Sequence, residues 1–425
     1  MHKLSFKEQI FVGITLFSMF FGAGNLIFPP ILGAQGGEAA LMAFIGFIVS
    51  AVGFPILGVI AIVRSGGLRQ LADRVGKKFS FIFTLVVYLS IGPCLAIPRT
   101  ASTSFEMAVT PFVSSGIVPV MRVIYSVVFF GVALYIALNP SKLVDTLGKK
   151  LAPALLVLIA LLFVGCLISG ATGTGEVAAK YAEGAAVTGF IDGYQTMDAI
   201  AALVYGIVLV MNIKGKGVTE ESDVAKVTLK AGYIAALIFI CVYGALTYIG
   251  TTGSVDAQNG AQVLTAIANT LFGTIGNVIL AVIFVIACLN TCISLICSCS
   301  EYFNEICPKI SYKKWVVILA VFSTVVSNAG LDAILVFSVP VLNCIYPIVI
   351  VLILLAFLPK STLSKHLVYP LTVLFAAIVG VIHTFSIPGL SAVCSYLPLY
   401  EAGLGWVLPA VVGVVIGLAC KGKKA

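Results

Sequence analysis

The decapeptide FGAGNLIFPP, residues 21–30, lies near the middle of the first long apolar run of the chain. It places two glycines, an asparagine and two prolines where a membrane-spanning helix has no water to satisfy an open backbone. Glycine permits unwinding, and proline starts or kinks the helix that follows. The stretch therefore predicts either a helix interrupted at mid-depth or a glycine-lined contact between helices.

The composition is that of a membrane protein. Of the 425 residues, 60% are hydrophobic and 10% are charged, and the mean hydropathy is +1.14, whereas soluble domains carry about 25% charged residues. Apolar stretches of about 20 residues recur along the whole chain. We interpret the first as a retained span, because no small-residue cleavage site follows it. The eleven cysteines, most of them inside apolar runs, are interpreted as buried thiols and not as a disulfide framework or zinc site.

Twelve membrane spans are predicted. They cover residues 8–34, 39–63, 79–109, 118–138, 150–170, 186–211, 228–250, 271–300, 315–328, 332–358, 367–386 and 403–420. With the N-terminus in the cytoplasm, every lysine and arginine except Arg99, Arg122 and Lys180 falls on the inside, as the positive-inside rule requires. The net charge of +8 therefore reports orientation and not a nucleic-acid partner. We expect a single transmembrane domain over residues 1–425, with both termini cytoplasmic.

A second interruption is predicted in the sixth span, where GFIDGYQTMDAIAALVYG covers residues 189–206. Its middle carries glycine, hydroxyl, amide and carboxylate groups, and ionisable residues inside a span mark functional sites. Spans one and six begin two sets of five spans, 8–170 and 186–358, which enter the membrane from opposite faces; 367–420 adds two helices. Interrupted helices at matching places of inverted repeats point to a transporter binding site. Helix N-termini suit a carboxylate there, and freed carbonyls suit an ammonium group or a small cation.

The eighth span carries a third polar group, in the stretch ACLNTCISLICSCSEYF. Asn290, Thr291 and Ser294 present side-chain oxygens within about one helical turn. Oxygen ligands of this kind suit a hard cation. The alternative is that the hydroxyls bond back to carbonyls of their own helix.

Four stretches in this order carry a resemblance to a known family. They are FGAGNLIFPP, IGPCLAIPRTASTSFE in the third span, GYQTMDAIAALVYG in the sixth, and ACLNT with the later EYF in the eighth. Together they resemble the branched-chain amino acid:cation symporter family, the LIVCS family of BrnQ-type carriers, over nearly the whole chain. That family is similar in architecture to LeuT-type transporters, which implies an all-α polytopic protein with a five-plus-five inverted repeat and two extra C-terminal helices, 12 in all.

The resemblance implies secondary active import of leucine, isoleucine and valine across a bacterial-type cell membrane, usually driven by sodium and with no other cofactor. Carried over by position, the substrate-binding residues would be Gly22, Ala23, Gly24 and Asn25 from span one and Gly193, Tyr194, Gln195 and Thr196 from span six. The sodium ligands would be Ser18, Phe21, Ala287, Asn290 and Thr291. Asn290 stands where the LeuT-type pattern has a hydroxyl residue, which leaves the identity of the ion open.

Several charged and polar residues need a role. Arg99 is expected in the outer half of span three, where Glu106, two turns along the same face, is a candidate partner. We interpret Arg99 as a structural or outer-gate charge and not as a substrate ligand, because the helix ends already supply a carboxylate site. Asp198 either fixes the unwound segment or carries a coupling proton, since burial favours a protonated carboxyl. Asn25 either caps the outer half-helix or reaches a ligand.

Other functions are less well supported. The three histidines are scattered and no phosphate-binding glycine loop is present, so we do not expect an enzyme. The alternatives to a sodium symporter are a proton-coupled carrier, a passive facilitator or channel, and a non-transporting nutrient sensor. The outer loop 251–270 is interpreted as either a short lid helix, with Val263, Leu264 and Ile267 on one face, or a plain surface turn.

Overall fold

The chain is a bundle of α-helices. The computed structural model describes residues 5–138, 140–170, 175–218, 220–253, 256–359, 361–362 and 365–420, with only the backbone described over 140–152. The described residues form helices and their connections, without strands. The termini lie outside these ranges, so the cytoplasmic position of both ends stays a prediction.

The first half of the bundle contains several helices that are interrupted within one predicted span. Its helices are α1 (Phe6–Phe20), α2 (Ala23–Gly36), α3 (Ala40–Ile48), α4 (Phe54–Ser65), α5 (Leu68–Asp73), α6 (Lys77–Leu89), α7 (Ala96–Ala108), α8 (Val118–Ala137) and α9 (Pro140–Ile168). Short π-helical segments, η2 (Val49–Gly53) and η3 (Ser90–Cys94), join α3 to α4 and α6 to α7. The α3–α4 and α6–α7 pairs therefore each form one bent span.

The second half repeats the interruption near its start. Its helices are α10 (Ala179–Ala182), α11 (Ala185–Asp192), α12 (Asp198–Gly215), α13 (Glu221–Thr251), α14 (Gly260–Ile306), α15 (Tyr312–Ser327), α16 (Leu331–Leu355), α17 (Val368–Phe385), α18 (Leu390–Cys394) and α19 (Val407–Ala419). A short 3₁₀ segment, η6 (Gly193–Thr196), separates α11 from α12. Within α14, Gly273 has a positive φ of 58° and breaks the helical path.

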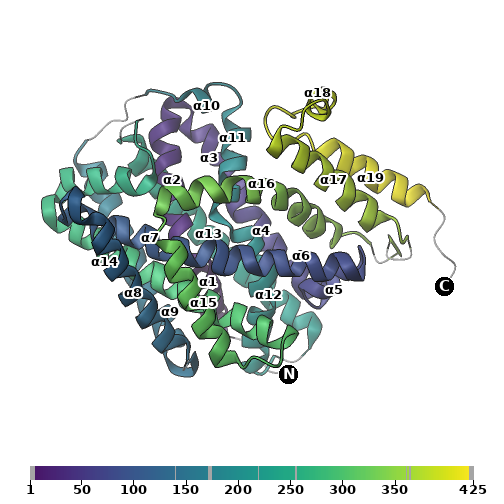
Figure 1. The fold of residues 1–425 in the computed structure, drawn as a ribbon, viewed down its shortest axis with the longest axis horizontal. Helices are drawn as coiled ribbons and strands as arrows, with labels where there is room; N and C mark the ends of the chain where they lie inside the picture. Colours follow the sequence, from purple (N-terminus) through teal and green to yellow (C-terminus); the bar gives the residue numbers. More distant parts are fainter. Residues whose placement is uncertain are drawn as a thin grey trace.

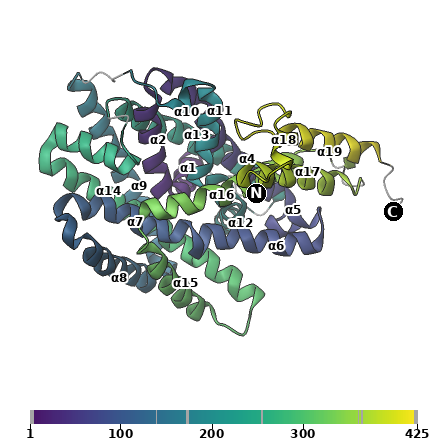
Figure 2. The ribbon, with the colours of Figure 1, turned by 45° about the horizontal axis from the view of Figure 1, so that its top comes forward.

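The two interrupted spans lie inside the bundle. The α2 helix packs on α13 and α14, α12 packs on α4, and α7 runs along α14. Figures 1 and 2 show α17, α18 and α19 together at one end, away from α8, α9 and α14. The centre of the bundle is therefore built from helices far apart in the sequence.

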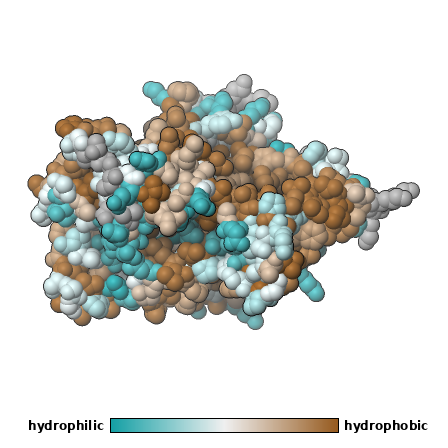
Figure 3. All heavy atoms as spheres, turned by 90° about the horizontal axis from the view of Figure 1, so that it is seen from above, coloured by the Kyte–Doolittle hydropathy of each residue, from teal (hydrophilic) through white to brown (hydrophobic). Residues whose placement is uncertain are grey.

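The outer surface is apolar and the interior carries polar groups. Outward-facing Leu41, Val120, Ile275 and Val336 are between 61% and 75% exposed, whereas Arg99 is only 3% exposed. The face seen in Figure 3 is largely hydrophobic at the end that carries α17 and α19. Such a distribution suits a helix bundle in lipid, with its polar groups turned toward the interior.

Eight helical segments of the described chain are long and apolar enough to cross a membrane, and two shorter apolar helices, 153–168 and Val407–Ala419, accompany them. The predicted spans coincide with helices throughout, although the number twelve stays a prediction. Of the two alternatives left open for 251–270, the structure shows the helix: α14 begins at Gly260, and Val263, Leu264 and Ile267 are buried. Residues 254–255 of that loop lie outside the described ranges. Its action as a lid stays a prediction.

Candidate functional site

The first interruption separates α1 from α2 at Phe21 and Gly22. Phe21 (φ −71°, ψ 100°) and Gly22 (φ −137°, ψ −156°) are extended, so one helix ends and another begins. The Asn25 side chain caps the new helix, because its Oδ1 accepts the Gly22 N–H at 2.8 Å. A Cβ on Gly22 would lie 2.6 Å from Thr291 Oγ1, so glycine allows the close approach of α14. The interruption predicted in this decapeptide is confirmed, and Asn25 acts as a cap.

Side chains of α14 take up the carbonyl groups that the end of α1 leaves free. Thr291 Oγ1 donates to Phe21 O at 3.2 Å, and Asn290 Nδ2 lies 3.3 Å from both Ser18 O and Ser18 Oγ. Ala287 is buried one turn earlier on α14. Four of the five expected sodium ligands thus meet in two pairs, Ser18 with Asn290 and Phe21 with Thr291. Carbonyl, hydroxyl and amide oxygens are the ligand types that a hard cation takes, and a sodium site here stays a prediction. Rotation of the Asn290 amide by half a turn would present Oδ1, in place of Nδ2, to a cation.

The second interruption turns the chain sharply at Met197. This residue has the left-handed backbone conformation (φ 67°, ψ 8°), which is uncommon outside glycine. The turn directs the preceding side chains to different neighbours. Gly193 packs against Ser50, with 2.6 Å from a notional Cβ to Ser50 Oγ, and Tyr194 stacks on Tyr346 with ring centroids 4.2 Å apart.

A buried network joins the two interruptions. Asn25 Nδ2 donates to Asp198 Oδ2 at 2.6 Å and also contacts the hydroxyl of Tyr243, which in turn donates to Asp198 Oδ2 at 3.2 Å. Asn25 and Asp198 are 2% and 3% exposed. The cap of α2 is therefore held by the first residue of α12, with Tyr243 of α13 as the third member. This arrangement favours the structural interpretation of Asp198, whose role in coupling stays a prediction.

Arg99 lies in the centre of the bundle and not with Glu106. The η3 segment, in which Gly92 (φ −91°, ψ −128°) and Pro93 interrupt the third span, directs the start of α7 toward span six. Arg99 Nη1 donates to Gln195 O at 2.7 Å and Nη2 to Thr196 O at 3.3 Å. The expected Arg99–Glu106 pair is wrong, because Glu106 instead faces Arg122 of α8 at 3.7 Å.

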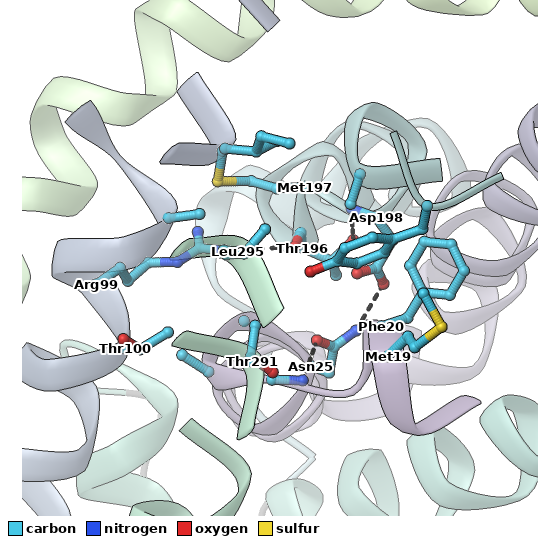
Figure 4. Close-up of a pocket in the computed structure, with 17 residues that line it drawn as sticks. Met19, Phe20, Asn25, Arg99, Thr100, Thr196, Met197, Asp198, Thr291 and Leu295 are labelled. Atoms are coloured by element: carbon cyan, nitrogen blue, oxygen red, sulfur yellow. Dashed lines mark hydrogen bonds between the residues drawn. The ribbon is translucent and has the colours of Figure 1, made fainter. Parts of the chain in front are cut away.

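These elements enclose a small cavity. It is lined by Met19, Phe20, Gly22, Ala23, Gly24, Asn25, Ile91, Ala96, Arg99, Thr100, Thr196, Met197, Asp198, Ala201, Tyr205, Thr291 and Leu295. Figure 4 shows Arg99 reaching toward Thr196, and Asn25 and Asp198 joined across the cavity. The free volume is about 30 Å³, room for no more than a few water molecules.

The cavity contains five of the eight expected substrate-binding residues. Gly22, Ala23, Gly24, Asn25 and Thr196 line it, whereas Gly193, Tyr194 and Gln195 do not; Gln195 meets Arg99 through its carbonyl. Sequence reasoning missed the apolar lining, which includes Met19, Phe20, Met197, Tyr205 and Leu295. Helical spacing could have identified Tyr205 as a lining residue, because it lies two turns after Asp198 on the same face of the helix.

Comparisons with known proteins agree with this architecture. A model of the family described as "Branched-chain amino acid transport protein" matches residues 5–424. The chain is similar to the branched-chain amino acid permease BraB of Bacillus subtilis, with 41% identity over 98% of this chain and 96% of the relative. It is also 39% identical to the branched-chain amino acid transport system 2 carrier protein of Pseudomonas aeruginosa, covering 97% and 96%.

Solved structures show the same fold at low identity. Mhp1, a nucleobase-cation-symport-1 family transporter in a closed conformation with bromovinylhydantoin bound, matches with a TM-score of 0.65 and 12% identity over 95% of this chain and 91% of its own. MhsT in complex with L-phenylalanine matches with a TM-score of 0.58 and 16% identity, covering 96% and 97%. Both are LeuT-like in fold. The chain is therefore a multi-pass membrane transporter, not an enzyme, and belongs to the family of branched-chain amino acid transport proteins.

Proposed function

We propose that this chain imports leucine, isoleucine and valine across a bacterial-type cell membrane by symport with sodium, with alternating access to one central site. The observation that carries the proposal is the meeting of two interrupted helices with the polar face of α14. Ser18 and Phe21 of span one lie against Asn290 and Thr291, and Asn25 is bonded to Asp198 of span six. Interrupted helices of this kind place freed backbone groups at a binding site.

Two larger pockets are lined in part by residues of span six, one by residues up to Tyr194 and the other by residues from Leu203 onward. One of about 240 Å³ is lined by Thr188, Tyr194 and other residues toward the predicted outer side, including Lys180. Another, of about 520 Å³, is lined by Leu203, Ile207 and residues of the predicted inner side, including Arg69. The central cavity holds about 30 Å³, so a branched amino acid enters only after the walls move apart. A closed central cavity of this size is expected of a carrier that opens its site to one side of the membrane at a time.

The cavity wall is divided into two chemical parts. Asn25, Arg99, Thr196, Asp198 and Thr291 provide polar groups. The remaining lining is mainly apolar and includes Met19, Phe20, Ile91, Met197 and Leu295. The two methionines among them are flexible and can adapt to a branched side chain. The charged amino and carboxylate groups of a branched-chain amino acid would fit the polar part, and its aliphatic side chain would fit the apolar part.

Sodium dependence is tested with purified protein in liposomes. Labelled leucine should accumulate above its external concentration under an inward sodium gradient, and unlabelled isoleucine and valine should compete. Equilibration without accumulation under any cation gradient would show a passive facilitator. The matched control uses the same liposomes with equal sodium on both sides.

Proton coupling is the alternative that a specific observation favours, since Asp198 is a buried carboxylate in the cavity wall. An inward proton gradient without sodium separates the two. Accumulation driven by protons alone, with no effect of sodium, would contradict the sodium assignment while keeping active transport.

Gly24 provides a steric test of the closed cavity. Gly24→Ala should lower leucine uptake at least about tenfold, because a Cβ would lie 2.8 Å from Arg99 Nη2 and 3.1 Å from the Thr196 backbone. Gly131→Ala in α8 is the matched control, since its Cβ meets nothing within 4 Å. The measurement is initial uptake rate at equal amounts of reconstituted protein. Uptake at the wild-type rate by Gly24→Ala would show that close packing here is dispensable.

A further inference from the structure

Arg99 is a buried cation that no described carboxylate neutralises directly. It is 3% exposed, lines the central cavity, and makes its hydrogen bonds to two carbonyl oxygens, Gln195 O and Thr196 O. The guanidinium carbon also lies over the face of the Phe28 ring, 5.7 Å from its centroid, which adds a weak cation–π attraction. Among the residues that the structure describes, Arg99 has no ion-pair partner within 4 Å, and charges at this depth are normally paired.

Part of the guanidinium remains free for a ligand. A guanidinium has five N–H donors, and two of its nitrogens are used on the carbonyls of η6. Arg99 Nε is buried and has no hydrogen-bond partner in the described part of the chain. Nε with a neighbouring Nη forms the planar fork that binds a carboxylate side-on. A carboxylate bound at this fork would leave the hydrogen bonds to the carbonyls of Gln195 and Thr196 in place.

The N-terminus of α2 lies next to this guanidinium. Gly22, Ala23 and Gly24 line the same cavity, and a Cβ on Gly24 would lie 2.8 Å from Arg99 Nη2. The first N–H groups of a helix lack partners within the helix and carry partial positive charge. A helix N-terminus and an arginine repel each other in a medium of low dielectric constant, unless an anion lies between them. Asp198 lines the same cavity, but its carboxylate accepts from Asn25 and Tyr243 and makes no ion pair with Arg99 within 4 Å in the described part of the chain. The convergence of Arg99 and the N-terminus of α2 therefore leaves a positive pole that a second carboxylate can bind.

We propose that Arg99 binds the carboxylate of the transported amino acid, together with the first turn of α2. This inference rests on the proposed function and names the group that holds one end of its substrate. It replaces the earlier interpretation of Arg99 as a purely structural or gating charge. Because Arg99 also holds Gln195 O and Thr196 O, an occupied site would brace the interruption of span six against α7.

The role makes a specific prediction about ligands with and without a carboxylate. Leucine and leucinamide share the side chain and the amino group, but leucinamide lacks the negative charge. Wild-type protein should bind leucine far more tightly than leucinamide. Arg99→Gln should weaken leucine binding about 100-fold, since hydrogen bonds between charged groups are among the strongest in proteins. Leucinamide binding should change less than about threefold, because it makes no charge-assisted bond to lose.

The experiment measures binding of labelled leucine to purified protein, with competition by leucinamide, in saturating sodium. Arg122→Gln is the matched control, because Arg122 faces Glu106 outside the cavity lining. Arg99→Lys replaces Arg99→Gln in the test if the latter does not fold. Lysine keeps the positive charge but lacks the planar fork, so its affinity for leucine should fall about tenfold while its affinity for leucinamide stays unchanged. Thermal melting of each variant confirms that it is folded.

Equal losses for leucine and leucinamide in both Arg99 variants, or a wild type that binds the two alike, would overturn the proposal and leave Arg99 as a brace of span six. Failure of the proposed symport shows itself differently. A wild type that binds leucine but does not accumulate it under a sodium gradient contradicts the symport, while the ratio of the two affinities still decides the role of Arg99.

Discussion

Asp198→Ala is expected to lower leucine uptake at least about 100-fold. Asp198 Oδ2 accepts from both Asn25 and Tyr243, and all three side chains are buried. Alanine would leave two buried donors without an acceptor, at about 1–3 kcal/mol each. Asn25 also caps α2, so a displaced Asn25 side chain would destabilise the first turn of that helix. Gly22 and Ala23 line the cavity at this turn. Initial uptake rates in liposomes, normalised to the amount of folded protein, provide the measurement.

Asp198→Asn separates the structural role from proton coupling. An asparagine retains an acceptor oxygen that both donors can share, but it cannot release a proton. With a structural role, this variant should keep sodium-driven uptake within about fivefold of wild type, as expected when a charge-assisted bond becomes a neutral one. Asp223→Asn on the exposed start of α13 is the matched control, since Asp223 pairs with Lys226 at the surface, away from the cavity. An Asp198→Asn variant as inactive as the alanine variant would assign Asp198 a function that needs its charge or its proton.

The helices themselves were predictable because a bilayer leaves the chain few options. An apolar run of about 20 residues must satisfy its backbone internally, so hydropathy alone locates the spans. The same constraint exposes the interruptions at Gly22 and at Gly193, where small and polar residues break otherwise apolar runs. Thr291 and Phe21, which the family resemblance named as ligands of one ion, lie in contact in the structure, although residue spacing alone gave no such long-range pairing.

The position of Arg99 could not be obtained from helical spacing. Arg99 and Glu106 share a face of an ideal helix, but partner choice depends on neighbours from other helices. Glu106 lies nearer to Arg122 of α8, and Arg99 nearer to the carbonyls of η6. The signal for the bend that brings Arg99 inward was present as Gly92 and Pro93, which interrupt the helix at η3.

The side chains of η6 illustrate a second limit. A stretch of four residues in a 3₁₀ turn directs its side chains to different sides, so adjacency in sequence does not mean a shared cavity. Tyr194 stacks on Tyr346 of α16, Gly193 packs on Ser50, and Thr196 alone of the four lines the cavity. These directions depend on the left-handed conformation of Met197, for which the residue type gave no warning.

The second large effect is expected at the proposed cation site. Thr291→Ala should raise the sodium concentration for half-maximal leucine uptake about tenfold. The loss of one oxygen ligand is expected to cost about 1.4 kcal/mol of sodium binding free energy, which corresponds to a tenfold change in affinity. Thr291→Ser keeps the hydroxyl that contacts Phe21 O and should stay close to wild type. Thr324→Ala is a matched control on α15, where the hydroxyl donates to Ala320 O of its own helix. Gly22→Ala should shift sodium dependence in the same direction, since its Cβ would lie 2.6 Å from Thr291 Oγ1. An unchanged sodium dependence in Thr291→Ala would remove this residue from the site, whereas a shift shared with Gly22→Ala would tie the ion to the contact between α14 and the end of α1.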